Sequence, residues 1–281
     1  MGAIEFHGLT KNYGKQRGVT ELNFSVEPGE IFGFIGPNGA GKSTTIRLLL
    51  NLIYPSGGSA TIMGHDVVTD SAAIKRFTSY VPSEVFYYEQ LTVRELLSYA
   101  GSFIEDYDRE YVDELCARFQ LDKTRKIEDL SLGNRKKVSL VVALMKRPKV
   151  IILDEPAAGL DPLMQNVLFE VLREHQATGT TIFLSSHNLP EVERYCDRVA
   201  VIRDGAVVEV ATVADVVKEA RKVVSIETAG GEKKVFLVKG NLNKLVARLA
   251  EYDLVDLEVR AETLEESFMK YYENNHEEAA R

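Results

Sequence analysis

The sequence contains little cysteine, no long hydrophobic run and fewer basic than acidic residues. Its two cysteines, Cys116 and Cys196, lie far apart without metal-ligand spacing, which argues against a disulfide framework and predicts reduced thiols in a cytoplasmic protein. No stretch approaches the ~18 apolar residues of a membrane span, and the N-terminus lacks the basic start and apolar core of a signal peptide. We therefore expect any membrane role to come through a partner.

The deficit of basic residues limits the classes of partner. Lysine and arginine number 34 against 42 acidic residues, so the formal net charge is −8. This balance argues against a nucleic-acid partner bound through a basic field, and against direct attachment to an anionic membrane surface. The 45% hydrophobic and 27% charged content is that of an ordinary globular protein, and 281 residues suffice for one large α/β domain with a small appendage.

Short apolar runs alternate with helical patterns as far as about residue 210. The runs are almost continuously apolar, which is typical of strands buried on both faces of a parallel sheet. The expected strands are residues 31–35, 78–81, 150–153, 181–185 and 198–202. The expected helices are residues 42–52, 92–103, 109–119, 135–146 and 163–176. The alternation predicts an α/β fold with helices on the faces of a mostly parallel sheet.

Two departures from this rhythm predict the domain organisation. Residues 84–147 hold helical patterns and no convincing strand, so we expect a helical subdomain inserted between two core strands. After residue 212, a hairpin signal, a helix at 242–251, a strand at 255–260 and a helix at 263–272 predict a small α+β module. We therefore expect a main domain at 1–212, a C-terminal module at 213–275 and a polar tail at 276–281.

A phosphate-binding loop follows the first apolar strand and opens a helix. The glycines allow the backbone N–H groups to turn toward an anion, and the helix N-terminus adds its positive dipole end. Lys42 supplies a charge for the β- and γ-phosphates of ATP, and Ser43 offers a hydroxyl to Mg²⁺. The loop consists of Gly36, Pro37, Asn38, Gly39, Ala40, Gly41, Lys42, Ser43 and Thr44.

An acidic pair ends the apolar strand at residues 150–153. A strand of this kind lies beside the phosphate loop, with its carboxyl end at the ligand edge of the sheet. We expect Asp154 to hold Mg²⁺, mostly through water, and Glu155 to act as the general base for the attacking water. The alternative interpretation is a strand that ends in a solvated acidic turn.

With these features the sequence resembles the nucleotide-binding subunit of ATP-binding-cassette (ABC) transporters over residues 1 to about 215. Seven motifs appear in the family's order. They are an adenine-stacking aromatic (Tyr13), the Walker A loop (36–44), the Q-loop (80–84), the signature sequence (130–134), Walker B with its catalytic glutamate (Asp154, Glu155), the D-loop (159–161) and the switch histidine (His187).

The resemblance implies a P-loop NTPase core with an additional antiparallel β part, and a dimer of cassettes, as a homodimer or a heterodimer. Two ATP molecules would lie between the subunits, each completed by Ser131, Gly133 and Asn134 of the other copy, with Asp161 nearby. His187 would contact the γ-phosphate and position Glu155. The resemblance also implies an integral membrane permease as partner, export as the direction, and peripheral attachment to the cytoplasmic face of the cell membrane.

Two departures from the family pattern put turnover in question. Ser83 replaces the Q-loop glutamine, and it reaches Mg²⁺ only through a water or shares that role with Glu84. Leu132 and Asn134 replace the signature glycine and glutamine. We interpret the following Lys136 and Lys137 as solvated charges on a helix face, with phosphate ligands as the alternative.

Three aromatic residues follow the Q-loop. Phe86, Tyr87 and Tyr88 are expected to contact the permease, with ordinary packing as the alternative.

The chain as a whole is expected to be a transporter ATPase. The alternatives are a cassette ATPase acting on ribosomes or nucleic acid, and a nucleotide-gated regulatory protein with negligible turnover.

Overall fold

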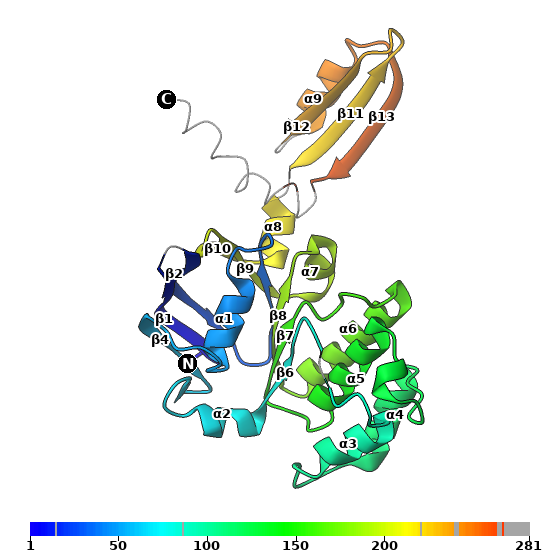
Figure 1. Ribbon diagram of the computed structural model, residues 1–281. Coiled ribbons are helices and arrows are strands. Elements are labelled where there is room, and N and C mark those ends of the chain that lie inside the picture. Colours follow the sequence, from blue (N-terminus) through cyan, green and yellow to red (C-terminus); the bar gives the residue numbers. More distant parts are fainter. Residues whose placement is uncertain (15, 86, 220, 239–241, 263–265, 267–281) are drawn as a thin grey trace. The chain divides into compact units, whose positions relative to one another are not determined.

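The computed structural model describes residues 1–14, 16–85, 87–219, 221–238, 242–262 and 266 (Figure 1). The chain divides into two compact units. The first comprises residues 1–188 and 195–210, and the second comprises residues 189–194 and 211–281. Within the described residues, none of the helices combines the length and the apolar character needed to cross a membrane.

A six-stranded sheet forms the centre of the first unit, with strand order β10-β9-β3-β8-β7-β6. The neighbours from β9 to β6 run parallel, which confirms the predicted α/β core. Every residue of β3, β7 and β8 is buried, as their apolar runs predicted. The strands are β3 (Ile31–Ile35), β6 (Thr78–Val81), β7 (Val150–Asp154), β8 (Thr181–Ser186), β9 (Arg198–Arg203) and β10 (Ala206–Thr212).

A four-stranded antiparallel sheet, ordered β2-β1-β4-β5, packs against this core. Its strands are β1 (Ile4–Tyr13), β2 (Gln16–Val26), β4 (Gly57–Ile62) and β5 (His65–Asp66). Phenylalanines join the two sheets: the Phe24 ring lies 4.1 Å from Phe6 and 5.7 Å from Phe32, centroid to centroid. The sequence patterns did not locate these strands, because they lack the continuous apolar runs of the core strands, and register shifts interrupt the alternation of buried and exposed residues in β1.

Helices cover the parallel sheet and form a group beyond its β6 edge, where α3, α4 and α5 lie on the opposite side from β1 and β4 (Figure 1). Thr92 closes a capping box at the start of α3, with its side chain accepting from the Glu95 N–H. The helices of the first unit are α1 (Lys42–Leu49), α2 (Ser71–Phe77), α3 (Val93–Gly101), α4 (Arg109–Arg118), the 3₁₀ turn η1 (Ile127–Asp129), α5 (Leu132–Leu144) and α6 (Pro162–Ala177). Helix α7 (Leu189–Tyr195) belongs to the second unit except for its last residue. The start of α5 precedes the expected residue 135 because Ser131 caps it.

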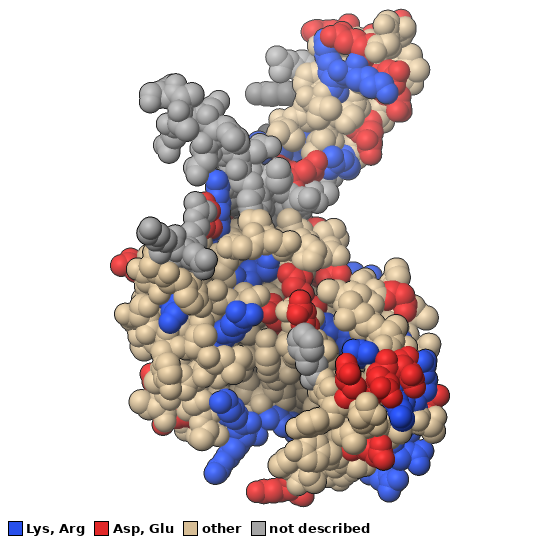
Figure 2. All heavy atoms as spheres, viewed as in Figure 1, with Lys and Arg blue, Asp and Glu red and all other residues tan. Residues whose placement is uncertain are grey.

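Charged side chains are dense where Figure 1 places α3 and α4. A group of acidic side chains is bordered there by basic ones on the face drawn in Figure 2. Several are paired, as in the 2.7 Å contact between Lys123 Nζ and Asp113 Oδ1. The two signs therefore neutralise each other locally, and this region does not present a field of a single sign.

The second unit holds a three-stranded antiparallel sheet, ordered β12-β11-β13. Leu245 and Leu249 of α9 pack on Val224 and Ile226 of β11, so the helix covers one face of this sheet. The elements are α8 (Val213–Glu219), β11 (Lys222–Thr228), β12 (Lys233–Val238), α9 (Leu242–Leu249) and β13 (Leu254–Ala261). The expected helix at 263–272 and the tail at 276–281 lie outside the described residues, apart from residue 266.

Candidate functional site

The phosphate loop connects β3 to α1 in a backbone path that requires glycine. A Cβ on Gly36 would lie 2.3 Å from the carbonyl oxygen of Ile202, so a side chain does not fit there. Gly41 has φ 115°, and its Cβ would lie 2.7 Å from Val19 Cγ1. Gly39 also has a positive φ, of 81°. The glycines thus serve both close backbone approach and left-handed geometry.

The N-terminus of α1 is open to an anion. Gly41 is its N-cap and supplies no side-chain hydrogen bond, so the first N–H groups of the helix are left for a ligand. The ammonium group of Lys42 donates to the carbonyl oxygens of Gly36 at 2.7 Å and Pro37 at 3.3 Å, and so folds back over the loop. Ser43 and Thr44 are half-buried in the first turn, whereas Pro37, Asn38 and Gly39 form the exposed tip and Ala40 is buried. The loop therefore fits a polyphosphate.

The acidic pair takes two different environments at the end of β7. Asp154 is 2% exposed, and its Oδ1 accepts a 2.6 Å hydrogen bond from the Ser185 hydroxyl on the neighbouring strand. Glu155 has φ 49°, in the left-handed region that costs a non-glycine residue roughly 1–3 kcal/mol. This turn aims the two carboxylates differently although they are adjacent in the sequence.

The Glu155 carboxylate lies between the phosphate-loop lysine and the histidine that follows β8. Its Oε1 is 3.5 Å from Lys42 Nζ, and its Oε2 is 2.7 Å from His187 Nδ1. Residues 42, 155 and 187 are thus joined, although they are distant in the sequence. The contact with His187 Nδ1 holds the Glu155 carboxylate in one orientation. It leaves the second ring nitrogen of His187 available for a ligand.

The donor set also fits a magnesium ion. Mg²⁺ is held in nucleotide sites by one or two carboxylates with waters and substrate phosphates, not by an all-protein cage. Within the described part of the chain, no group of three or more histidine, cysteine, aspartate or glutamate side chains is arranged to hold a metal. The buried Asp154 carboxylate and the Ser43 hydroxyl supply the ligand types that such a shared site requires.

The signature residues stand at the start of α5. The Ser131 side chain caps the helix and accepts from the Asn134 N–H at 3.3 Å. A Cβ on Gly133 would lie 2.5 Å from the Gly159 carbonyl oxygen, so glycine is required where α5 meets the loop after β7. Leu132 is 66% exposed beside these donors. Asp161 caps α6 and accepts from the Met164 N–H at 3.0 Å, which gives that side chain a local structural role.

The expectation that Lys136 and Lys137 are solvated is wrong. They are 2% and 8% exposed, because α5 packs against β6, α3 and α4 and has almost no free face. The Lys136 ammonium donates to the carbonyl oxygens of Pro82 and Ser83. Burial lowers the pKa of Lys136 to about 8, against the opposing influence of the Asp154 and Glu155 charges. The helical pattern did not reveal this burial, since lysine on a helix is usually exposed.

Tyr13 lies at the end of β1, opposite Gln16. Its ring is 42% exposed, with Lys11 Nζ 5.3 Å from the ring centroid. The same hairpin carries Val19, which adjoins Gly41 of the phosphate loop. An exposed ring on a strand beside the loop is suited to stack on a base.

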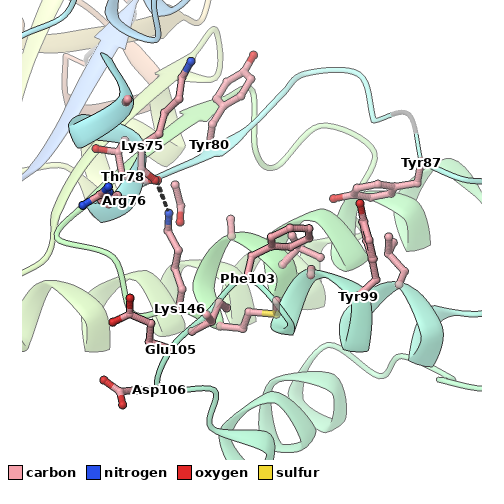
Figure 3. Close-up of a pocket in the computed structure, with 18 of the residues that line it drawn as sticks. Lys75, Arg76, Thr78, Tyr80, Tyr87, Tyr99, Phe103, Glu105, Asp106 and Lys146 are labelled. Carbon is pink, nitrogen blue, oxygen red and sulfur yellow. Dashed lines mark hydrogen bonds between the residues drawn. The ribbon is translucent and has the colours of Figure 1, made fainter. Parts of the chain in front are cut away.

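A groove of about 1390 Å³ lies between the start of β6 and the helices α3 and α5 (Figure 3). Tyr87, Tyr99 and Phe103 project into it, and Glu105 and Asp106 lie along another part of its rim. Lys75, Arg76 and Thr78 line the β6 side, where Lys146 Nζ donates to the Thr78 carbonyl oxygen at 2.6 Å. Tyr88 is 66% exposed and also lines the groove, whereas Phe86 lies outside the described residues.

Comparisons with known proteins agree with this geometry. A family model described as "ABC transporter" matches residues 19–158. The bacitracin transport ATP-binding protein BcrA of Bacillus licheniformis is 34% identical over 242 residues, covering 84% of this chain and 78% of that protein. The linearmycin resistance ATP-binding protein LnrL of Bacillus subtilis (strain 168) is 32% identical, with coverage of 84% and 78%.

A solved structure supports the fold of this chain over most of its residues. An ATP-binding subunit of an ABC transporter superposes with a TM-score of 0.71 at 30% identity, covering 88% of this chain and 99% of that chain. A Nod factor export ATP-binding protein I of Mesorhizobium japonicum (strain LMG 29417 / CECT 9101 / MAFF 303099) is 38% identical over 208 residues, which cover 61% of it. The predicted P-loop NTPase fold is confirmed.

Proposed function

The chain belongs to the ABC transporter family as an ATP-binding, ATP-hydrolysing subunit, and we propose that it drives export through a separate membrane permease. Hydrolysis by this chain is carried by the contacts of the Glu155 carboxylate, which lies 3.5 Å from Lys42 and 2.7 Å from His187 at the phosphate loop. Export is supported by relatives of this chain whose names refer to export of Nod factors and to resistance to linearmycin and daunorubicin/doxorubicin.

The chemistry assigned to the site follows from these contacts. Lys42 and the N-terminus of α1 hold the β- and γ-phosphates and neutralise their charge. His187 orients the Glu155 carboxylate, which accepts a proton from the water that attacks the γ-phosphate. Ser43, Asp154 and Ser83 supply the oxygen ligands for Mg²⁺, which offsets phosphate charge when it is bound. Tyr13 stacks on the adenine.

A second cassette completes the site. Ser131, Gly133 and Asn134 stand at the N-terminus of α5. The Ser131 side chain takes one of the helix's first N–H groups, and the remaining donors with the positive end of the helix dipole suit a γ-phosphate presented by another copy. Asp161 lies on the loop that Gly133 packs against, close to the same surface. We place two ATP molecules between two such subunits, identical or related, with each phosphate loop facing the other subunit's signature helix.

The groove lined by Tyr87, Tyr88, Tyr99 and Phe103 receives a cytoplasmic segment of the permease. Tyr88, Tyr99 and Phe103 are exposed, and aromatic groups of this kind are enriched at protein interfaces because they bury large areas with little loss of conformational freedom. Tyr88 and Tyr99 pack edge to face at 6.3 Å between centroids, so the wall is preorganised. This docking holds the subunit at the cytoplasmic face of the cell membrane.

The substitution Glu155→Gln tests the assignment of Glu155 as the general base for ATP hydrolysis. It preserves the shape of the side chain and removes the base, so we expect ATP binding within about twofold of wild type and turnover lower by a factor of about 10² or more. Phosphate release and ATP affinity are measured on the purified chain, and size-exclusion chromatography with ATP detects a trapped dimer. The exposed carboxylate variant Glu251→Gln is the control. Steady-state turnover unchanged by Glu155→Gln refutes the proposal.

A further inference from the structure

Lys136 connects three segments of the nucleotide site through its ammonium group. Its Nζ lies 2.7 Å from the carbonyl oxygen of Pro82, 3.1 Å from that of Ser83 and 3.4 Å from that of Asp154. An ammonium group has three protons, and here each of the three has a backbone acceptor. The side chain is almost completely withdrawn from solvent, at 2% exposure.

The three acceptors belong to functional parts of the site. Pro82 and Ser83 begin the segment after β6, which we call the Ser83 loop (residues 82–85). Asp154 ends β7 immediately before Glu155. Lys136 itself lies one turn into α5, the helix that Ser131 caps. One side chain thus joins the Ser83 loop, the acidic pair and the signature helix.

Stability alone does not account for a lysine at this position. Removing an ammonium group from water is costly, and lysine is seldom buried for stability alone. Methionine has nearly the same length and avoids that cost, although it leaves the three carbonyl oxygens without their donor. The lysine holds three backbone segments together at a fixed spacing, and methionine cannot do so because it has no hydrogen-bond donor.

We propose that Lys136 is a positioning residue for ATP hydrolysis, which holds the Ser83 loop and the first turns of α5 in fixed relation to Asp154 and Glu155. The inference rests on the proposed role of Glu155 at the site. Displacements of about 1 Å in a catalytic constellation lower rates by as much as 10²-fold. Losing the three contacts therefore affects turnover more strongly than nucleotide binding, which depends on the phosphate loop.

The test compares Lys136→Met, Lys136→Arg and the control Lys137→Met. Lys137 is the next residue of α5 and is also buried, but the three carbonyl contacts belong to Lys136. Each variant is measured for melting temperature, ATP dissociation constant, kcat, KM and the Mg²⁺ concentration that gives half-maximal turnover.

We expect Lys136→Met to lower the melting temperature modestly, because three carbonyl oxygens lose their donor, and to keep the ATP dissociation constant of wild type. Its kcat should fall by about 10- to 100-fold, and its Mg²⁺ requirement should rise. Lys136→Arg should recover most of the loss because it keeps the charge and the donors, and Lys137→Met should behave as wild type.

Three results would overturn the inference: a kcat for Lys136→Met within twofold of wild type, an equal loss in Lys137→Met, or a loss of nucleotide binding together with a lower melting temperature. The Glu155→Gln variant tests the site separately, because its loss of turnover relative to wild type verifies the hydrolytic site. A negative result for the Lys136 variants therefore leaves the proposed function intact.

Discussion

At the scale of single residues, side chains that are adjacent in the sequence occupy different environments in the site. Asp154 and Glu155 are adjacent, yet one is buried beside Ser185 and the other faces Lys42 and His187. The positive φ of Glu155 is the backbone feature that separates them. The folded structure offsets that local strain, and the site gains a carboxylate held in a single orientation.

Tyr13 allows nucleotide binding to be separated from hydrolysis. We expect Tyr13→Ala to raise the ATP dissociation constant roughly fivefold through the loss of about 1 kcal/mol of stacking, with kcat at saturating ATP unchanged. Equilibrium titration with ATP and steady-state kinetics measure the two quantities. Tyr54→Ala, which removes a 68% exposed tyrosine, is the control. Equal ATP affinity in wild type and Tyr13→Ala would contradict the stacking role.

At the scale of elements, α4 and α6 are connected by a buried polar contact. The Tyr111 hydroxyl lies 2.7 Å from His175 Nε2, and Arg147 stacks over the Tyr111 ring at 4.3 Å. Arg118 and Glu174 form an ion pair between the same helices. These side chains thus connect α4 to α6, although the helical pattern of the sequence does not distinguish their positions from others.

His175 makes this connection sensitive to pH. Burial, and then the nearby Arg147 charge, lowers the pKa of His175 below its usual 6.5 in the folded chain. The unfolded chain therefore binds the proton more readily, so the stabilisation present above pH 6.5 is lost as the pH falls through that value toward the folded pKa.

We expect the free energy of unfolding of wild type to decrease more between pH 7.5 and 5.5 than that of His175→Gln, as measured by urea titration. Parallel pH dependences in the two proteins would exclude this role for His175.

At the scale of the whole molecule, the groove and the nucleotide site share the segment after β6. Ser83 contacts Lys136, and Tyr87 and Tyr88, a few residues later, line the groove. Movement of the proposed partner would reach the acidic pair through this short backbone segment and the hydrogen bonds of Lys136, and it would give transport and hydrolysis a means of coupling.

A charge in the groove should separate coupling from catalysis. We expect Tyr88→Glu to leave basal ATP turnover of the purified chain within twofold of wild type, because Tyr88 is exposed and lines a groove that includes no residue of the phosphate loop. Co-purification with the permease from membranes should be lost, since a carboxylate in an aromatic interface carries a desolvation cost. Tyr54→Glu is the matched control. Retained co-purification in Tyr88→Glu would place the partner surface elsewhere.

The sequence by itself determined the parallel core and the phosphate loop. Both are local: glycine spacing dictates where a backbone closes around an anion, and continuous apolar runs dictate strands buried on both faces. Whether residues 155 and 187 meet, and whether Lys136 faces water or three carbonyl groups, was decided only by the tertiary structure. These properties depend on which elements pack together, and a lysine on a helix has the same local pattern in either environment.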